Sequence, residues 1–155
     1  MRTNVEILVF RVGETILGVN IREIKEVLGE SKIYPLPNVS EIILGNINVR
    51  GTIWVLLDLK RILLGENKDG SKKKYFLLTK DRENKVAFLC DEIIDILDIT
   101  PGEIQRIENG NKKAKSFFLG QVYYNNRVIP IINLKKITQT DLDKLSEINF
   151  EEIIR

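Results

Sequence analysis

The sequence predicts an all-β protein with only short helices, built from two related halves. Apolar, β-branched segments of five to eight residues recur along the 155-residue chain, and turn-forming Gly, Pro, Asn and Asp residues separate them. Short strands at such close spacing are typical of barrels and sandwiches. The order of segments in the first half also recurs in the second, which indicates a duplicated unit.

Each expected strand is a short run rich in Ile, Val, Leu, Phe or Tyr. Gly13-Glu14 separates the first two runs, and Tyr34-Pro35-Leu36-Pro37 ends the third, because two prolines exclude a continuing ladder. In the first half we expect strands at 7–12, 15–21, 26–33, 42–49 and 52–57. In the second half we expect strands at 75–79, 85–89, 91–99, 117–124 and 128–132.

Helical turns are expected where a capping residue can start them. Asn20 can cap a single turn over 21–24, and Asp58 can cap a short helix over 58–63. Thr100-Pro101-Gly102-Glu103 has the order of a capping box with proline at the first helical position. All three segments are expected to be short.

The remaining segments divide into two loops and a tail. Residues 65–74 and 109–115 are polar and rich in lysine, and we expect them to be loops. The tail from Thr140 onward has three apolar residues at helical spacing: Leu142, Leu145 and Ile148. This pattern predicts a multi-turn helix at the C-terminus.

The duplication is visible in a gap-free alignment of residues 45–62 with residues 120–137. Both segments open with Gly, pass through a polar turn and an apolar strand, and end with Asp or Asn, Leu, two basic residues and Ile. Upstream, residues 7–27 align with residues 76–96, also without a gap. Each copy therefore specifies the same strands and the same capped turn.

We interpret residues 1–155 as one domain with approximate subdomains at 15–75 and 76–137. A unit of about 70 residues buries only about 60% of its unfolded surface, so it is marginally stable alone. Two such units packed together gain a common core. The N-terminal strand and the C-terminal helix are expected to pack at their junction.

Composition excludes several classes of chemistry. The chain has no His and a single Cys, Cys90, so Ser-His-Asp or Cys-His catalysis, a phospho-accepting histidine, an internal disulfide and a structural zinc site are excluded. We expect no cofactor and no metal. The longest apolar run, residues 53–57, is far short of the roughly 20 residues that cross a bilayer. We therefore expect a cytoplasmic protein without a signal peptide.

The sequence also has features of two other classes of protein, a nucleic-acid-binding barrel and an enzyme that acts through carboxylates. The lysine-rich segments 72–74 and 112–115 leave a small nucleic-acid-binding β-barrel as the alternative, although a net charge of +2 opposes it. Asp91, Glu92, Asp95 and Asp98 would suit an enzyme only if two of them converged in a cleft. Residues 65–72 resemble a phosphate-binding loop, but Lys and Ser are in the wrong order.

Asn48-Val49-Arg50-Gly51 is the motif that points to binding. Glycine accepts a positive φ, and asparagine tolerates turns, so the geometry of a hairpin explains Gly51 and Asn48. Turn geometry does not require Arg50. A guanidinium at a rigid tip offers a fork of donors to a carboxylate or to carbonyl groups of a partner.

With its flanks, this motif resembles the CheW-like family of bacterial chemotaxis coupling proteins. The similar residues are Gly45, Asn48, Arg50 and Gly51, followed by an apolar strand and Asp58-Leu59. The opening ILVFRVGETILGVNIREIKEV is also similar, including Gly18 and Glu26. One departure is Val55, where the family usually has proline; Pro130 occupies the equivalent place in the second copy.

The resemblance implies two five-stranded SH3-like β-barrels on a shared hydrophobic junction, without catalytic activity. It implies an adaptor that couples the cytoplasmic hairpin of methyl-accepting chemoreceptors to the regulatory domain of the chemotaxis histidine kinase in membrane-associated arrays. Kinase contacts are expected at the barrel ends. The residues carried over to partner binding are Glu26, Val27, Leu28, Asn48, Arg50 and Gly51.

Two structural expectations accompany these residues. Glu26 and Arg50 should lie close enough to pair, which would orient the turn. Val27 and Leu28 could both line an apolar groove for a receptor helix. Adjacent strand residues face opposite sides, however, so one of them, Val27 in preference to Leu28, could instead point into its own barrel.

Overall fold

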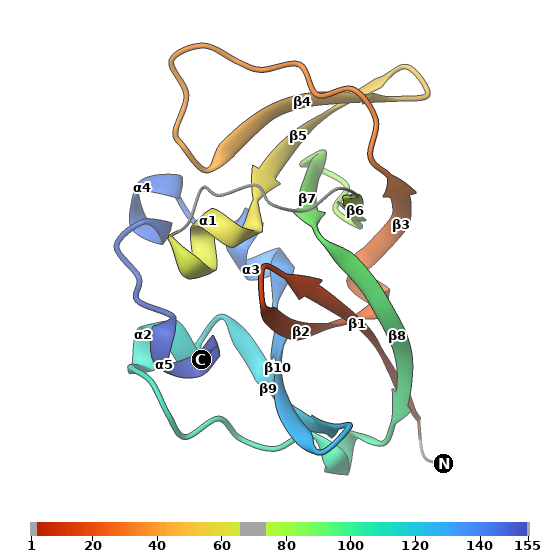
Figure 1. The fold of residues 1–155 in the computed structure, drawn as a ribbon, viewed down its shortest axis with the longest axis vertical. Coiled ribbons are helices and arrows are strands. Elements are labelled where there is room, and N and C mark those ends of the chain that lie inside the picture. The colour runs from red at the N-terminus through yellow and green to blue at the C-terminus, as the bar shows by residue number, and fades with distance from the viewer. Residues whose placement is uncertain (1–2, 66–73, 155) are drawn as a thin grey trace.

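The computed structural model describes residues 3–65 and 74–154, and the ten strands within them form two five-stranded sheets (Figure 1). Sheet A contains β1 (Val5–Val12), β2 (Thr15–Asn20), β8 (Glu92–Ile99), β9 (Phe118–Tyr124) and β10 (Arg127–Ile132). Sheet B contains β3 (Ile24–Gly29), β4 (Ile43–Val49), β5 (Thr52–Asp58), β6 (Tyr75–Thr79) and β7 (Val86–Cys90). The predicted all-β class with two five-stranded units is confirmed.

The two sheets have equivalent internal orders. Sheet A runs β8-β1-β2-β10-β9, and sheet B runs β3-β6-β7-β5-β4. In each sheet a parallel pair, β2 with β10 or β7 with β5, joins two groups of antiparallel strands. Replacing each strand by its aligned counterpart converts one order into the other, so the sequence repeat is also a structural repeat.

Each sheet combines strands from both copies of the repeat. β6 and β7 pair with β3 and β5, and β1 and β2 pair with β8 and β10. A division of the chain at residue 75 therefore does not separate the sheets, because the first two strands of each copy are exchanged. The physical reason is that strand patterns specify which residues alternate, but not which strand becomes the neighbour.

A shared hydrophobic core joins the two sheets. Phe10 and Leu17 of sheet A belong to one buried cluster with Leu77 and Phe88 of sheet B. Two smaller clusters lie within the individual sheets, one around Trp54 and the other around Ile7, Val9, Val122, Ile129 and Ile131. The shared cluster is the hydrophobic junction expected from the sequence.

One short helix follows the last strand of each repeat, and the two helices occupy equivalent positions. α1 (Leu59–Leu64) begins where Asp58 accepts a hydrogen bond from the Arg61 amide at 3.2 Å. α3 (Leu134–Thr138) begins where Asn133 accepts one from the Lys136 amide at 3.1 Å. Their first residues, Leu59 and Leu134, are fully buried in the shared core. The predicted Asp58 cap is confirmed.

The two predicted single turns are also present. In η1 (Ile21–Glu23) the side chain of Asn20 accepts from the Arg22 amide at 3.0 Å. In η2 (Pro101–Glu103) the carboxylate of Glu103 accepts from the Thr100 amide at 3.0 Å and from its hydroxyl at 3.2 Å. η1 connects β2 to β3, and η2 follows β8.

The C-terminal segment is not the multi-turn helix predicted from its spacing. It forms two single turns, α4 (Leu142–Leu145) and α5 (Glu151–Ile154). Phe150 lies between them, 1% exposed, with its ring edge-on to Phe117 and Phe118 at centroid distances of 5.6 and 6.0 Å. A continuous helix would not give the chain this inward bend, so burial of the aromatic ring overrides local helical spacing.

The lysine-rich segments have different outcomes. Residues 112–115, predicted as part of a loop, form α2 (Lys112–Lys115), because Asn111 caps the Ala114 amide at 2.8 Å and Ala114 is buried. The interior of the predicted loop 65–74 lies outside the described residues.

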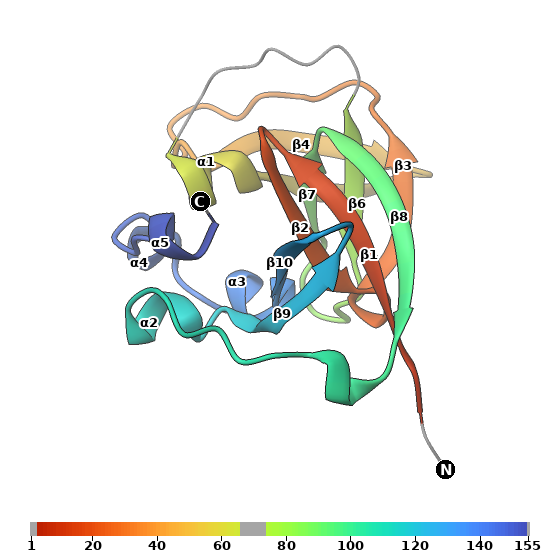
Figure 2. The same cartoon turned by 60° about the horizontal axis from the view of Figure 1, so that its bottom comes forward.

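The short helices also pack against each other: α5 lies beside α1 (Figure 2). Within the described part of the chain, no helix has the length and apolar character needed to traverse a bilayer.

Candidate functional site

The Asn48–Gly51 motif forms a two-residue hairpin turn between β4 and β5. Val49 pairs with Thr52, which leaves Arg50 and Gly51 at the tip with φ values of 49° and 87°. The side chain of Asn48 accepts a hydrogen bond from the Gly51 amide at 2.8 Å. Positive φ at both central residues is the backbone of a type I′ turn, for which Asn-Gly is preferred over Arg-Gly. Arg50 therefore holds a backbone conformation that is costly for a residue with a side chain, and turn geometry does not account for its presence.

Arg50 forms a two-pronged ion pair with Glu26. Its Nη1 and Nη2 atoms donate to the two carboxylate oxygens at 3.1 and 2.5 Å. This confirms the predicted pairing. The hydrogen bond and the charge of Arg50 lower the pKa of Glu26, and Glu26 in turn raises the pKa of Arg50. The side chain of Arg50 remains 66% exposed, so the pair holds the guanidinium in place while leaving it accessible.

The pair joins the two edges of sheet B. Glu26 lies on β3 and Arg50 follows β4, and these are the outermost strands of the sheet. An edge strand presents unpaired backbone groups, and the Glu26–Arg50 contact ties one edge to the hairpin that carries the other. The candidate site is thus built by the curvature of the sheet.

The structure resolves which of Val27 and Leu28 faces outward. Leu28 is half-buried and packs against the cluster around Trp54, whereas Val27 is 37% exposed. The expectation that Val27, in preference to Leu28, points into its own barrel is therefore wrong. The reason is a β-bulge: Ile24 opposes Thr79 and Glu26 opposes Leu78, so Lys25 is an extra residue that shifts the alternation.

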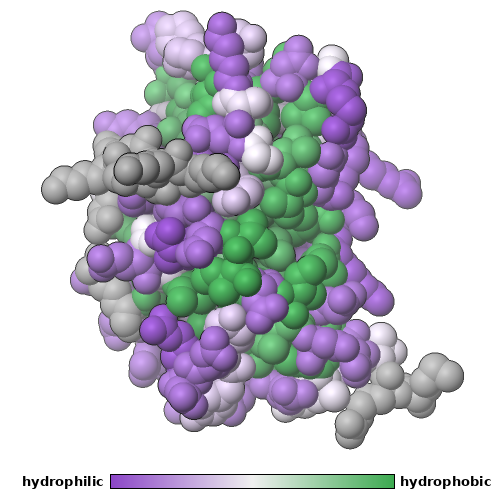
Figure 3. Space-filling model, turned by 45° about the vertical axis from the view of Figure 1, so that its right-hand side comes forward, coloured by the Kyte–Doolittle hydropathy of each residue, from purple (hydrophilic) through white to green (hydrophobic). Residues whose placement is uncertain are grey.

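Val27 has an exposed counterpart in the second copy. The equivalent residue on β8 is Ile96, which is 52% exposed. β3, which carries Val27, and β8, which carries Ile96, both lie on the right of Figure 1. Figure 3 brings this side forward and shows a band of apolar residues bordered by hydrophilic ones. An exposed apolar band with a polar border is typical of a protein-interaction surface.

The second copy closes its sheet with different chemistry. Asp95 aligns with Glu26, and its carboxylate accepts a hydrogen bond from the Tyr124 hydroxyl at 3.3 Å. Asn125 and Asn126 occupy the places of Arg50 and Gly51, with φ values of 47° and 64°. The fold thus makes the same turn without a guanidinium, and the presence of Arg50 in the first copy is not a requirement of folding.

The clustered carboxylates have structural partners. Asp91 is buried and accepts from Lys74 and from the Gly13 amide, and Glu92 pairs with Arg11 at 3.0 Å. Burial opposes ionisation of Asp91, but its hydrogen bonds outweigh this effect and lower its pKa. Among residues 3–65 and 74–154, no three acidic or Cys side chains are grouped for a metal ion. These contacts stabilise the β1–β2 hairpin and its connection to β8.

Cys90 has the environment of a structural residue. Its side chain is buried in the shared core. Burial and the adjacent Asp91 carboxylate raise the pKa of the Cys90 thiol to about 12. The thiol is therefore protonated at neutral pH and unsuited to nucleophilic attack.

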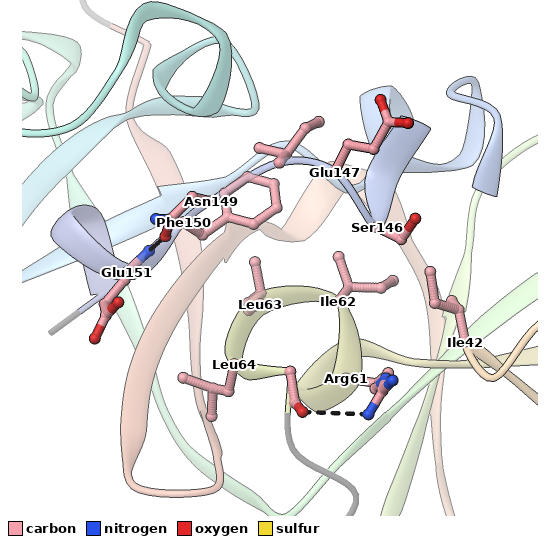
Figure 4. Close-up of a pocket in the computed structure, with 12 residues that line it drawn as sticks. Ile42, Arg61, Ile62, Leu63, Leu64, Ser146, Glu147, Asn149, Phe150 and Glu151 are labelled. Atoms are coloured by element: carbon pink, nitrogen blue, oxygen red, sulfur yellow. Dashed lines mark hydrogen bonds between the residues drawn. The ribbon is translucent and has the colours of Figure 1, made fainter. Parts of the chain in front are cut away.

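A cavity of 390 Å³ lies away from the Arg50 turn, between α1 and residues 146–151 (Figure 4). Ile62 and Leu63 face it from α1, and Phe150 faces it from the C-terminal segment. Arg61 at its edge pairs with Glu41 and donates to the Gly65 carbonyl. This cavity lies between two packed segments of the chain, and none of the residues predicted for partner binding lines it.

Sequence reasoning missed the surroundings of Trp54. The Nζ atoms of Lys25 and Lys85 lie 5.6 and 5.4 Å from the centroid of its ring, next to Arg50. The signal in the sequence was the single tryptophan of the chain in a strand that follows the Arg50 turn. The positions of both lysines depend on a bulge and on a parallel strand pair, which the local sequence does not reveal.

Comparison with known proteins agrees with this fold. Residues 6–141 match the family described as the CheW-like domain. The chain is 29% identical over 134 residues to the chemotaxis protein CheW of Thermotoga maritima, covering 86% of this chain and 87% of that protein. It is 30% identical over 142 residues to the protein FrzA of Myxococcus xanthus, covering 90% and 88%. The crystal structure of the scaffolding protein TtCheW from Thermoanaerobacter tengcongensis matches with a TM-score of 0.76 at 25% identity, covering 99% of this chain and 94% of that one.

The fold and the turn define a duplicated β-protein that presents an exposed guanidinium–carboxylate pair at a surface hairpin. The chain belongs to the CheW-like domain family, in agreement with the sequence resemblance. Its relatives and the matching scaffold structure support a scaffold or adaptor role in chemotaxis.

Proposed function

We propose that this protein couples chemoreceptors to the chemotaxis histidine kinase without performing a chemical step. One partner is the cytoplasmic hairpin of a methyl-accepting receptor, and the other is the regulatory domain of the kinase. The protein acts in the cytoplasm and is recruited to receptor arrays at the membrane by these contacts. No cofactor takes part.

The observation that carries the proposal is the Arg50–Glu26 pair at the tip of a strained turn. Glu26 fixes the guanidinium in a carboxylate fork, and the guanidinium is 66% exposed. Val27, next to Glu26, adds an exposed apolar side chain on the same edge strand. A held cation beside an apolar strand suits a partner helix that has both apolar and polar groups.

For the kinase we assign the barrel ends, in a pseudo-symmetric contact with the homologous regulatory domain. The β9–β10 hairpin of sheet A presents Tyr123 and Val128, a cross-strand pair that is 65% and 40% exposed. Aromatic and β-branched residues paired across strands form a firm apolar surface. This hairpin is equivalent in the repeat to the one that carries Arg50.

A pull-down with a receptor cytoplasmic hairpin and with the kinase regulatory domain tests the proposal. Wild-type protein should capture both partners, and Arg50→Ala should reduce receptor capture. Arg106→Ala, which removes an exposed arginine elsewhere on the surface, is the matched control and should behave as wild type. Wild-type protein that captures neither partner contradicts the proposal, and steeply salt-dependent binding to RNA or DNA instead would favour the nucleic-acid-binding alternative.

A further inference from the structure

Three positively charged side chains converge beside Trp54. Lys25, Arg50 and Lys85, together with Val49, Thr52 and Trp54, line a pocket of 180 Å³. Both lysine ammonium groups lie within 6 Å of the Trp54 ring centroid, at 5.6 and 5.4 Å. The pocket therefore has an aromatic wall, a threonine and three cations.

The backbone fixes the position of each cation separately. Lys25 is the extra residue of the bulge in β3, and a bulge re-aims a side chain. Arg50 is held at the hairpin tip by its turn and by Glu26. The carbonyl of Lys85 accepts from the Val55 amide at 2.9 Å, which places Lys85 alongside Trp54. Three distant segments thus bring like charges to one place.

The charges of the pocket are not balanced within the described chain. Three cations and the single carboxylate of Glu26 leave a net charge of 3 − 1 = +2. In the described ranges 3–65 and 74–154, no carboxylate forms an ion pair with Lys25 or Lys85. Like charges that line one pocket repel one another, and an anion placed among them would relieve the repulsion.

Resting on the proposed function, which assigns the Arg50 surface to the receptor, we propose that this pocket receives one acidic side chain of the receptor hairpin. Its volume is below the usual range of about 300–1,000 Å³ for small-molecule sites and suits the end of a single Asp or Glu side chain. Val27, two residues beyond Lys25 on the same strand, is exposed. This combination of cations and an apolar neighbour fits a protein segment better than a nucleic-acid backbone.

The test compares charge-removing and charge-conserving variants in binding to the receptor hairpin and to the kinase regulatory domain. The double variant K25Q/K85Q should bind the receptor hairpin about tenfold or more weakly, with a shallower dependence on salt because fewer charges are neutralised, and should bind the kinase regulatory domain as wild type does. The double variant K25R/K85R should stay within about threefold of wild type. K112Q/K113Q on α2 makes the same charge change elsewhere and should bind as wild type. Circular dichroism checks that all variants are folded.

Trp54 provides a reporter inside the pocket because it is the single tryptophan of the chain. Its fluorescence should change when the receptor hairpin binds to wild type, and should change less when it binds to K25Q/K85Q. The inference is overturned if K25Q/K85Q binds the receptor hairpin like wild type, even though the proposed function would then stand. It is also overturned if only inorganic phosphate or a single-stranded DNA saturates the fluorescence change. Failure of wild type to bind either partner would contradict the proposed function itself.

Discussion

Arg50 donates hydrogen bonds to both carboxylate oxygens of Glu26 and so connects the two edge strands of sheet B. A guanidinium has five N–H donors, and Glu26 accepts from two of its nitrogens, which leaves further donors for a partner. In the second copy, Tyr124 and Asp95 link the corresponding edges. The comparison separates two roles: closing the sheet, which both copies perform, and presenting a cation, which only the first copy performs through this turn.

The Glu26–Arg50 pair should act as one unit in receptor binding. In a double-mutant cycle with Glu26→Gln and Arg50→Ala, each single variant should weaken binding, and the double variant should lose less than the product of the single losses. We expect a coupling of roughly two- to tenfold, in the lower part of the range for directly contacting residues. Isothermal titration with the receptor hairpin measures it. Losses that simply multiply would show that Glu26 does not orient Arg50.

Replacement of the buried carboxylate Asp91 should destabilise the protein at neutral pH. Asp91→Asn removes the charge of the carboxylate that pairs with the buried Lys74, which should reduce the free energy of unfolding by about 3 kcal/mol. Urea denaturation at pH 7 measures this loss. Glu92→Gln removes a more exposed pair with Arg11 and should change the free energy of unfolding by less than about 1 kcal/mol.

The Asp91 pair also predicts the direction of an acid effect. Its hydrogen bonds lower the folded-state pKa below that of the unfolded chain. The pair therefore contributes fully at pH above the unfolded pKa, and this contribution is lost as the pH falls through the folded pKa. Wild type should lose more stability than Asp91→Asn between pH 6 and pH 2. Parallel stability curves for the two proteins would contradict this assignment.

Gly45 should tolerate a side chain much less well than Gly51. At Gly45, a Cβ would collide with the backbone carbonyl of Tyr34, whose strand bridge to Asn46 requires this close approach. At Gly51 nothing lies within 4 Å of an added Cβ, so only the positive φ of 87° resists the change. We expect Gly45→Ala to cost at least about 2 kcal/mol of folding free energy and Gly51→Ala about 1 kcal/mol.

The second copy provides a check on this comparison. Gly120 aligns with Gly45, and a Cβ there would meet the carbonyl of Gln105 in the equivalent bridge to Gln121. Gly120→Ala should therefore match Gly45→Ala in thermal and urea unfolding. Equal effects of all three substitutions would show that backbone φ, and not the close approach, limits these positions.

Phe150 should be essential to the core although it lies near the end of the chain. It is 1% exposed and packs edge-on against Phe117 and Phe118. Phe150→Ala should lower the free energy of unfolding by about 3–5 kcal/mol. The neighbouring Glu152→Ala, on the exposed side of α5, should change it by less than about 0.5 kcal/mol. A small effect of Phe150→Ala would mean that the C-terminal segment is detached in solution.

The sequence allowed the strands and caps to be predicted because their determinants are local. Alternating β-branched residues, Asp58 before a short helix and Asn48 before Gly51 each specify structure within a few residues. The gap-free repeat extended this to equivalent strand orders. Exchange of the first two strands between the copies was not predictable, since it depends on which strand edges meet.

The candidate site was predictable only in part for the same reason. The family resemblance singled out Glu26 and Arg50, and the pairing expected between them on physical grounds is present in the structure. The outward direction of Val27 and the position of Lys25 over Trp54 both follow from one bulge in β3. A bulge is produced by the pairing of β3 with β6, and the residues of β3 alone do not specify it.

Size-exclusion chromatography of the three proteins tests directly whether this protein joins the receptor hairpin to the kinase regulatory domain. The receptor hairpin and the kinase regulatory domain are loaded with wild-type protein or with Arg50→Ala. We expect wild type to elute in one complex with both partners, and Arg50→Ala to lose the receptor hairpin while retaining the kinase domain. Separate elution of all three wild-type components, or an unchanged complex with Arg50→Ala, would contradict it.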